Sequence, residues 1–156
     1  MPGNGAVRVE HVATRPLAAA RTTTSRQRLS ASIRELLDQV WPVLRSQGVR
    51  TGHNVVSYYP SGAGELTIEA GVETLSDFRA TGAVQPAATP SGEVATVAYY
   101  GEYSGLGTAY QALERWCADN HRQPAGINWE VYGDWAENPA ELRTDVYFLL
   151  APSEGS

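Results

Sequence analysis

Apolar residues recur along positions 29–46 with the spacing of an amphipathic helix. They stand at 29, 33, 36, 37, 40, 41 and 44, which places them on one face. Gly48 follows where a C-terminal cap belongs, and Pro42 is expected to kink the helix or end its regular part. A second stripe covers residues 105–120, with its apolar face at Leu106, Ala109, Tyr110, Leu113 and Trp116. The pattern therefore predicts two main helices.

Runs rich in β-branched and aromatic residues predict strands before and after each helix. These strands are expected at residues 7–21 (interrupted by Pro16), 53–59, 65–72, 94–100, 127–132 and 142–150. Between the two sets, residues 74–92 contain Gly and Pro among small residues and read as a linker by composition. The order strand, helix, strand, strand thus occurs twice.

The two halves also match in detail. The segment from His53 to Tyr58 aligns with the segment from Ile127 to Tyr132, and further matches pair Trp41 with Trp116, Gly52 with Gly126, and Glu65-Leu66 with Glu141-Leu142. Matches in register favour an internal duplication. We predict an α+β fold of pseudo-twofold duplicated β-α-β-β units, with antiparallel sheets and two main helices flanking a central ligand cleft. The expected halves are 7–73 and 93–150, joined by the linker 74–92, with disordered ends at 1–6 and 151–156.

Composition narrows the classes of partner. The 156-residue chain has a net charge of −5, and its 12 basic residues, all Arg, are scattered, which disfavours nucleic acid. One cysteine excludes an internal disulfide, and the three histidines stand apart, so we expect no metal and no cofactor. No apolar run of about 18 residues and no signal peptide is present, so we expect a cytoplasmic protein without a membrane span. The oligomeric state is not predicted.

Glu130 is the residue with the clearest chemical argument. Alternation along 127–132 places Asn128, Glu130 and Tyr132 on one face of the strand, so two environments are open. Either the strand is an edge strand and Glu130 points to water, or its carboxylate lines an aromatic pocket. In that pocket, desolvation would raise the pKa of the carboxyl group and a cationic ligand would restore its charge. Four Trp and eight Tyr against two Phe favour a cleft lined with aromatic rings.

Several segments together resemble the GyrI-like family of small-molecule-binding domains, which also occur fused to AraC-type and MerR-type regulators. The resembling segments are Gly64–Val72, Gly101–Leu106, the helix through Trp116, Gly126–Tyr132 and Leu142–Tyr147. The resemblance spans roughly residues 7–150 and implies paired β-α-β-β units around a ligand groove. In multidrug-binding members a buried Glu on the matching strand meets lipophilic cations, which maps onto Glu130. The resemblance further implies candidate aromatic contacts, which we expect at Tyr58, Tyr103, Trp129, Tyr147 and Trp41.

The resemblance implies three kinds of function for a stand-alone member, and no DNA-binding domain is expected on this chain. The first is a protein that binds lipophilic, cationic or aromatic small molecules, with a role in drug or toxin resistance. The second is a hydrolase that opens strained cyclopropane rings of DNA-alkylating natural products, in which Glu130 activates water and Tyr132 assists. The third is a gyrase-inhibitor-like module that binds a protein.

Overall fold

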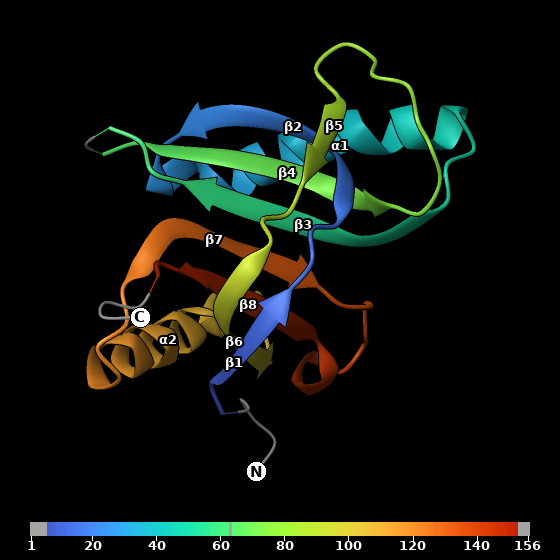
Figure 1. Ribbon diagram of the computed structural model, residues 1–156. Helices are drawn as coiled ribbons and strands as arrows, with labels where there is room; N and C mark the ends of the chain where they lie inside the picture. Colours follow the sequence, from blue (N-terminus) through green and yellow to red (C-terminus); the bar gives the residue numbers. More distant parts are fainter. Residues whose placement is uncertain (1–5, 63, 153–156) are drawn as a thin grey trace. The chain divides into compact units, whose positions relative to one another are not determined.

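The computed structural model describes residues 6–62 and 64–152 (Figure 1). The chain divides into two compact units. The α1 unit comprises Thr14–Pro90, and the α2 unit combines the described residues up to Ala13 with those from Ser91 onward. The ends expected to be disordered, 1–6 and 151–156, lie outside the described residues except for Ala6, Ala151 and Pro152.

The α1 unit packs one long helix on one face of an antiparallel sheet. Its elements are β2 (Pro16–Thr24), the 3-10 turn η1 (Arg26–Arg28), α1 (Leu29–Ser46), β3 (Thr51–Tyr59), β4 (Leu66–Thr74) and β5 (Gln85–Ala88). The strand order is β3-β4-β2-β5. Leu36, Val40 and Leu44 form the buried stripe of α1, in agreement with the predicted apolar face. The helix packs against β2 and β4, whose small residues allow close approach.

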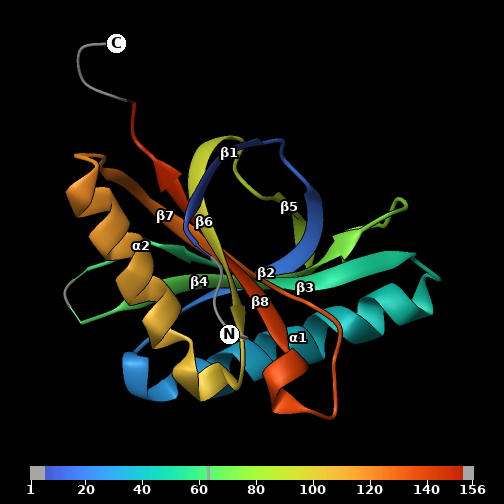
Figure 2. The same cartoon turned by 90° about the horizontal axis from the view of Figure 1, so that it is seen from below.

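The α2 unit repeats this arrangement. Its elements are β1 (Arg8–Val12), β6 (Gly92–Tyr100), the 3-10 turn η2 (Tyr103–Gly105), α2 (Gly107–Asp119), β7 (Pro124–Tyr132), the 3-10 turn η3 (Pro139–Glu141) and β8 (Arg143–Leu150). The strand order is β1-β6-β8-β7. α2 packs on one face of the sheet, against β6 and β8 (Figure 2). Ala109, Leu113 and Cys117 of the helix meet Val146 and Phe148 of β8 in one apolar cluster.

The predicted duplication of a β-α-β-β unit is confirmed. In β2-α1-β3-β4 the last strand lies between the other two, and in β6-α2-β7-β8 it does so again. Both hairpins carry an irregularity at the same place: the register shifts between Thr51 and Asn54 in one unit and between Pro124 and Asn128 in the other. The α+β class with antiparallel strands and two main helices is therefore the one observed.

The predicted boundaries of the halves differ from the observed units because the two edge strands are exchanged. β1 precedes β2 in the chain but pairs with β6, with Arg8 opposite Thr96 and Val12 opposite Gly92. β5 lies inside the expected linker 74–92 and pairs with β2. The interruption expected at Pro16 thus separates two strands of different units, so 7–73 is not one half. Strand pairing is decided by tertiary packing, which local sequence patterns do not report.

Helix α1 passes through Pro42 and ends at Ser46, so the expected end of its regular part at Pro42 is wrong. Pro42 is exposed, and water can therefore satisfy the backbone carbonyl that lacks its intrahelical partner there. The second helix begins two residues later and ends one residue earlier than predicted.

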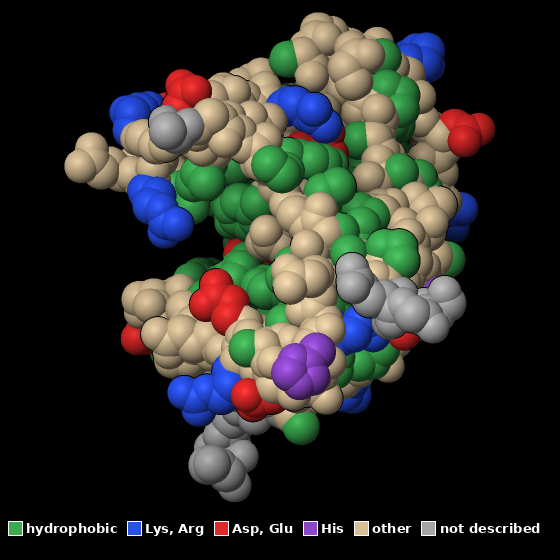
Figure 3. All heavy atoms as spheres, turned by 60° about the vertical axis from the view of Figure 1, so that its left-hand side comes forward, with side chains coloured by type: hydrophobic (Ala, Val, Ile, Leu, Met, Phe, Trp, Pro, Cys, Tyr) green, Lys and Arg blue, Asp and Glu red, His purple; other side chains and the backbone are tan. Residues whose placement is uncertain are grey.

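Charged side chains are scattered over the face shown in Figure 3. Basic and acidic side chains both occur there, and the described residues form no continuous basic area. This dispersion agrees with the scattered arginines of the sequence. No helix in the described part of the chain combines the length and the apolar character that crossing a membrane requires.

Candidate functional site

Glu130 is buried on the face of β7 that α2 covers. Its side chain is 2% exposed. In the sheet, Glu130 lies opposite Val146 and Asn128 lies opposite Phe148. Val146 and Phe148 both belong to the apolar cluster beneath α2, so Glu130 faces the helix and not the other side of the sheet. Of the two environments considered for Glu130, the buried one is observed.

Two tyrosine hydroxyls donate to the two oxygens of this carboxylate. The hydroxyl of Tyr110, on α2, donates to Oε2 of Glu130, and the hydroxyl of Tyr132, two residues along β7, donates to Oε1. Both tyrosines are partly exposed, whereas the carboxylate beneath them is buried. Each oxygen of the buried carboxylate therefore accepts a hydrogen bond from a tyrosine hydroxyl.

A third polar group, the amide of Asn128, completes the cluster. Its Nδ2 donates to the hydroxyl oxygen of Tyr110 over 3.1 Å. Asn128, Glu130 and Tyr132 alternate with apolar residues along β7, so one strand supplies three of the four polar side chains. The fourth, Tyr110, comes from the helix. We call Asn128, Tyr110, Glu130 and Tyr132 the carboxylate cluster.

Aromatic rings surround the carboxylate cluster. Tyr103, in the η2 turn, meets the ring of Tyr132 edge-on at 5.6 Å between centroids. Phe148 lies against Tyr110 at 5.7 Å with the ring planes tilted by 48°. Such offset and edge contacts hold rings in place. Tyr103 is 49% exposed, so an aromatic face remains open beside the cluster.

Two of the predicted aromatic contacts lie on the opposite face of the same sheet. Trp129 is buried and stacks on Tyr147, with centroids 5.2 Å apart and planes 8° apart. Because side chains alternate along β7, Trp129 points away from the face that carries Glu130. The structure therefore brings Glu130, Tyr132 and Tyr103 together and separates Trp129 and Tyr147 from them within the unit.

The other two predicted contacts belong to the α1 unit. Trp41, on α1, donates from Nε1 to Oδ1 of Asn54 over 3.2 Å, and the guanidinium of Arg45 lies 5.5 Å from its ring. Tyr58 follows on β3 and lies, like Asn54, on the helix-covered face. Between them, Val56 is fully buried where the aligned position of the α2 unit has Glu130.

Two further buried carboxylates, Glu69 and Glu73, are neutralised by arginines. Arg21 lies 3.1 Å from Glu69, and Arg15 lies 3.1 Å from Glu73. Glu73 also accepts the backbone N–H of His53, which serves the irregular part of β3. These carboxylates therefore have a structural role, whereas the partners described for Glu130 are tyrosines.

Two nucleophilic side chains outside the carboxylate cluster, Cys117 and Tyr59, have shifted pKa values. Burial raises the pKa of the Cys117 thiol above its usual value, so this thiol is less ionised than a free cysteine at neutral pH. Burial, together with the charge of Glu69, also raises the pKa of Tyr59. Neither group belongs to the carboxylate cluster. Among the described residues, no three His, Cys, Asp or Glu side chains are arranged to hold a metal ion.

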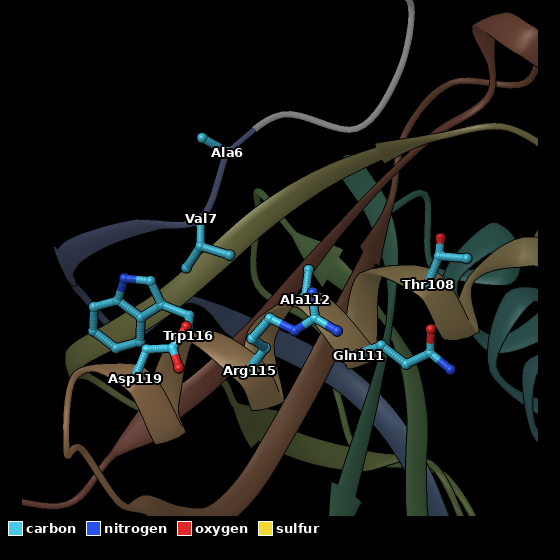
Figure 4. Close-up of a pocket in the computed structure, with 8 residues that line it drawn as sticks. All are labelled: Ala6, Val7, Thr108, Gln111, Ala112, Arg115, Trp116 and Asp119. Atoms are coloured by element: carbon cyan, nitrogen blue, oxygen red, sulfur yellow. The ribbon is translucent and has the colours of Figure 1, made fainter.

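A surface cavity of about 500 Å³ lies elsewhere on the α2 unit (Figure 4). It is lined by residues of α2, including Gln111, Arg115 and Trp116, and by Ala6 and Val7. None of the predicted site residues lines it.

Tyr110 is the member of the carboxylate cluster that the sequence did not assign to the site. The helical pattern places Tyr110 on the inner face of α2 beside Leu113. This position was the signal in the sequence that could have assigned Tyr110 to the site. A tyrosine on an inner helix face needs a partner for its hydroxyl, and a carboxylate on the facing strand can provide it.

Comparison with known proteins agrees with this fold. The EcmrR chain of an EcmrR–DNA complex is 17% identical with a TM-score of 0.79; the alignment covers 96% of this chain and 58% of EcmrR. The C-terminal domain of EcmrR alone is 18% identical with a TM-score of 0.75, covering 94% and 98%. SAV2435, solved with tetraphenylphosphonium, is 10% identical with a TM-score of 0.69, covering 93% of each chain.

A hydrolase encoded by lin2189 of Listeria innocua is also similar, at 10% identity and a TM-score of 0.61, covering 94% of this chain and 92% of the hydrolase. These likenesses establish the shared fold. The chain spans little more than half of the full EcmrR chain. A search of curated proteins gives no match.

The fold and the buried cluster define a small-molecule-binding domain of two β-α-β-β units. The chain belongs to the GyrI-like family, whose small molecule binding domain model matches residues 5–151.

Proposed function

We propose that this domain binds lipophilic cations that carry aromatic groups, with Glu130 as the counter-charge. The observation that carries the proposal is the buried carboxylate of Glu130, held by two tyrosine hydroxyls. An ionised carboxylate loses much of its hydration on burial, and a ligand cation compensates for that loss. A neutral ligand does not.

The aromatic rings around the cluster supply the second part of the recognition. Tyr103 and Tyr132 present ring faces and edges beside the carboxylate. Ring faces attract cations, most strongly where water is excluded. An aromatic cation therefore gains from the charge pair and from the ring contacts together. Tyr58, Trp129, Tyr147 and Trp41 stay predicted ligand contacts, to be tested by the same titrations.

A neighbour with the same fold supports this class of ligand. The SAV2435 structure contains tetraphenylphosphonium, a lipophilic cation with four aromatic rings. A protein that sequesters such compounds lowers their free concentration, which is the basis for proposing a role in resistance to toxic small molecules.

The test is a calorimetric titration with tetraphenylphosphonium and with neutral triphenylphosphine oxide. Glu130→Gln keeps the shape of the side chain and removes its charge. We expect it to weaken cation binding by about 1–3 kcal/mol, roughly 5- to 150-fold in Kd, because a charged partner is lost. Binding of the neutral compound should change little.

Glu114→Gln is the matched control, because Glu114 is exposed on α2 and the substitution changes the net charge equally. It should leave both affinities within about twofold. Equal losses for the cation and the neutral compound in Glu130→Gln would count against a charge pair. No binding of either compound by the wild-type protein would reject this ligand class.

Hydrolysis of a strained ring is the second candidate function. The contact between Glu130 and Tyr132 brings a carboxylate and a hydroxyl together, and the Listeria innocua neighbour is described as a hydrolase. In this reaction Glu130 takes a proton from water, the water oxygen bonds to a ring carbon, and the ring C–C bond breaks. The ring carbon left with the electron pair takes a proton from the hydroxyl of Tyr132, and Glu130 returns the proton taken from water to Tyr132. Mass spectrometry of a cyclopropane-bearing alkylator would then reveal a product heavier by one water, formed by the wild type and not by Glu130→Gln.

A further inference from the structure

We propose that Asn128 is a positioning residue, which fixes the direction of the hydrogen bonds that end on Glu130 and thereby raises affinity for cations. The inference rests on the proposed binding function and concerns a residue whose described hydrogen bond within the cluster is to Tyr110. Three observations carry it: the two contacts of the Tyr110 hydroxyl, the burial of Glu130, and a matching asparagine in the other unit.

The hydroxyl of Tyr110 has one proton and two described neighbours. One neighbour is Oε2 of Glu130, which accepts when the carboxylate is ionised, and the other is Nδ2 of Asn128, which can only donate. The proton therefore lies toward Glu130, and the hydroxyl oxygen accepts from Asn128. The order of donation is Asn128 to Tyr110 to Glu130.

This order matters because the carboxylate is buried. A hydroxyl that receives a hydrogen bond becomes a better donor, so Asn128 strengthens the bond that Tyr110 makes to the charge. With the amide in place, Tyr110 cannot turn its proton toward position 128. The carboxylate thus keeps its donor before a cation arrives, and no rearrangement of the cluster is needed on binding.

The α1 unit provides an internal comparison. Asn54 aligns with Asn128, and each follows the irregular start of its strand. Asn54 accepts through Oδ1 from the indole of Trp41, and the neighbouring position is Val56. The same residue type therefore accepts where the helix offers a donor and no carboxylate is present. It donates where the helix residue itself donates a hydrogen bond to Glu130.

The test is a double-mutant cycle on cation binding with Asn128→Leu and Tyr110→Phe. Asn128→Leu keeps a similar volume and removes the donor. We expect the Kd for tetraphenylphosphonium to rise about three- to tenfold and the Kd for triphenylphosphine oxide to change little. In the Tyr110→Phe background, Asn128→Leu should change the cation Kd by less than about twofold, since the hydroxyl through which it acts is gone.

Unfolding by urea without ligand tests the direction of the hydrogen bonds independently. Asn128→Asp is close in shape but can only accept when ionised, so two carboxylates would compete for one Tyr110 proton. At pH 7 we expect it to lower the folding equilibrium constant by about tenfold or more, and further than Asn128→Leu does. An Asn128→Asp protein as stable as the wild type would overturn the assigned direction.

The outcomes separate the two proposals. If Glu130→Gln loses the cation while Asn128→Leu does not, the positioning role is wrong and the proposed function stands. If Asn128→Leu weakens cation and neutral ligand equally, or by the same factor in the Tyr110→Phe background, Asn128 serves only the fold. If the wild type binds no cation, the proposed function and the affinity role of Asn128 both fail. The unfolding measurements then decide the hydrogen-bond direction alone.

Discussion

At the scale of single residues, the main contrast lies between Glu130 and Val56. Both are buried at aligned positions of a helix-covered strand, and only one has an ionisable side chain. Burying a carboxylate destabilises a fold unless hydrogen bonds compensate, and the Tyr110 and Tyr132 hydroxyls provide those bonds. Burial of Glu130, unlike that of Val56, therefore depends on these two hydrogen bonds, which is consistent with the binding role proposed for it.

Removing either hydroxyl should destabilise the ligand-free protein. Tyr110→Phe and Tyr132→Phe each remove one hydrogen-bond donor from a buried carboxylate oxygen, and we expect each to lower the free energy of unfolding by about 1–3 kcal/mol. Tyr100→Phe is the control, because the Tyr100 hydroxyl meets Arg143 at the surface and should contribute less than about 0.5 kcal/mol. Urea unfolding measures all three. Equal effects of the three substitutions would contradict the compensating role of Tyr110 and Tyr132.

Part of this cluster could be predicted from the sequence. Alternation along β7 placed Asn128, Glu130 and Tyr132 on one face, because a strand repeats every two residues. Tyr110 was missed as a member because pairing a helix residue with a strand residue depends on tertiary packing. The same alternation places Trp129 and Glu130 on opposite faces of β7. From the sequence, both residues were nevertheless expected to contact the same ligand.

At the scale of elements, strands β2 and β4 approach each other closely at Gly71. A Cβ at Gly71 would lie 2.6 Å from Cβ and 2.8 Å from Cα of Ala19, and closer still to the carbonyl oxygen of Ala18. Backbone atoms cannot yield as a flexible side chain can. Glycine at this position therefore permits the β2–β4 pairing.

Gly71→Ala should lower the free energy of unfolding by about 1–3 kcal/mol, as overpacking does. Gly107→Ala is its counterpart, because a Cβ at this first residue of α2 meets nothing within 4 Å. Alanine there restricts the unfolded chain and favours the helix, so we expect about 0.4–1 kcal/mol of stabilisation. Chemical denaturation compares the two. A neutral Gly71→Ala would show that β2 can move away from β4.

The elements themselves were largely predictable. The 3.6-residue period gave the bounds of α1, and the turns bounded the hairpins, because both signals are local. β5 was missed because its four residues include Pro86, which marks loops and edge strands alike. The partner of β1 was missed because the paired residues are far apart in the chain: Val12 lies opposite Gly92, and Arg8 lies opposite Thr96.

At the scale of the whole molecule, the exchanged edge strands tie distant parts of the sequence to one unit. Deleting residues 1–13 removes β1 and leaves β6 as an edge strand of the α2 unit. We expect hydrogen exchange at the β6 amides bonded to β1 to rise by about tenfold or more, since these amides lose their acceptors. The amides of β4 in the α1 unit are the control and should keep their protection. Faster exchange in β4 and unchanged exchange in β6 would contradict the observed pairing.

The exchange of edge strands also has a consequence for the protein during its synthesis on the ribosome. β1 is made before the α1 unit, but its partner β6 begins only at Gly92, after the whole of Thr14–Pro90. The α1 unit has all of its strands, including β5, once Pro90 has emerged. The α2 unit must wait for the last strand, β8, to join β6 and β7. The unit that contains Glu130 is therefore the last to be completed, and a translation product that stops before β8 lacks the strand on which Glu130 is paired.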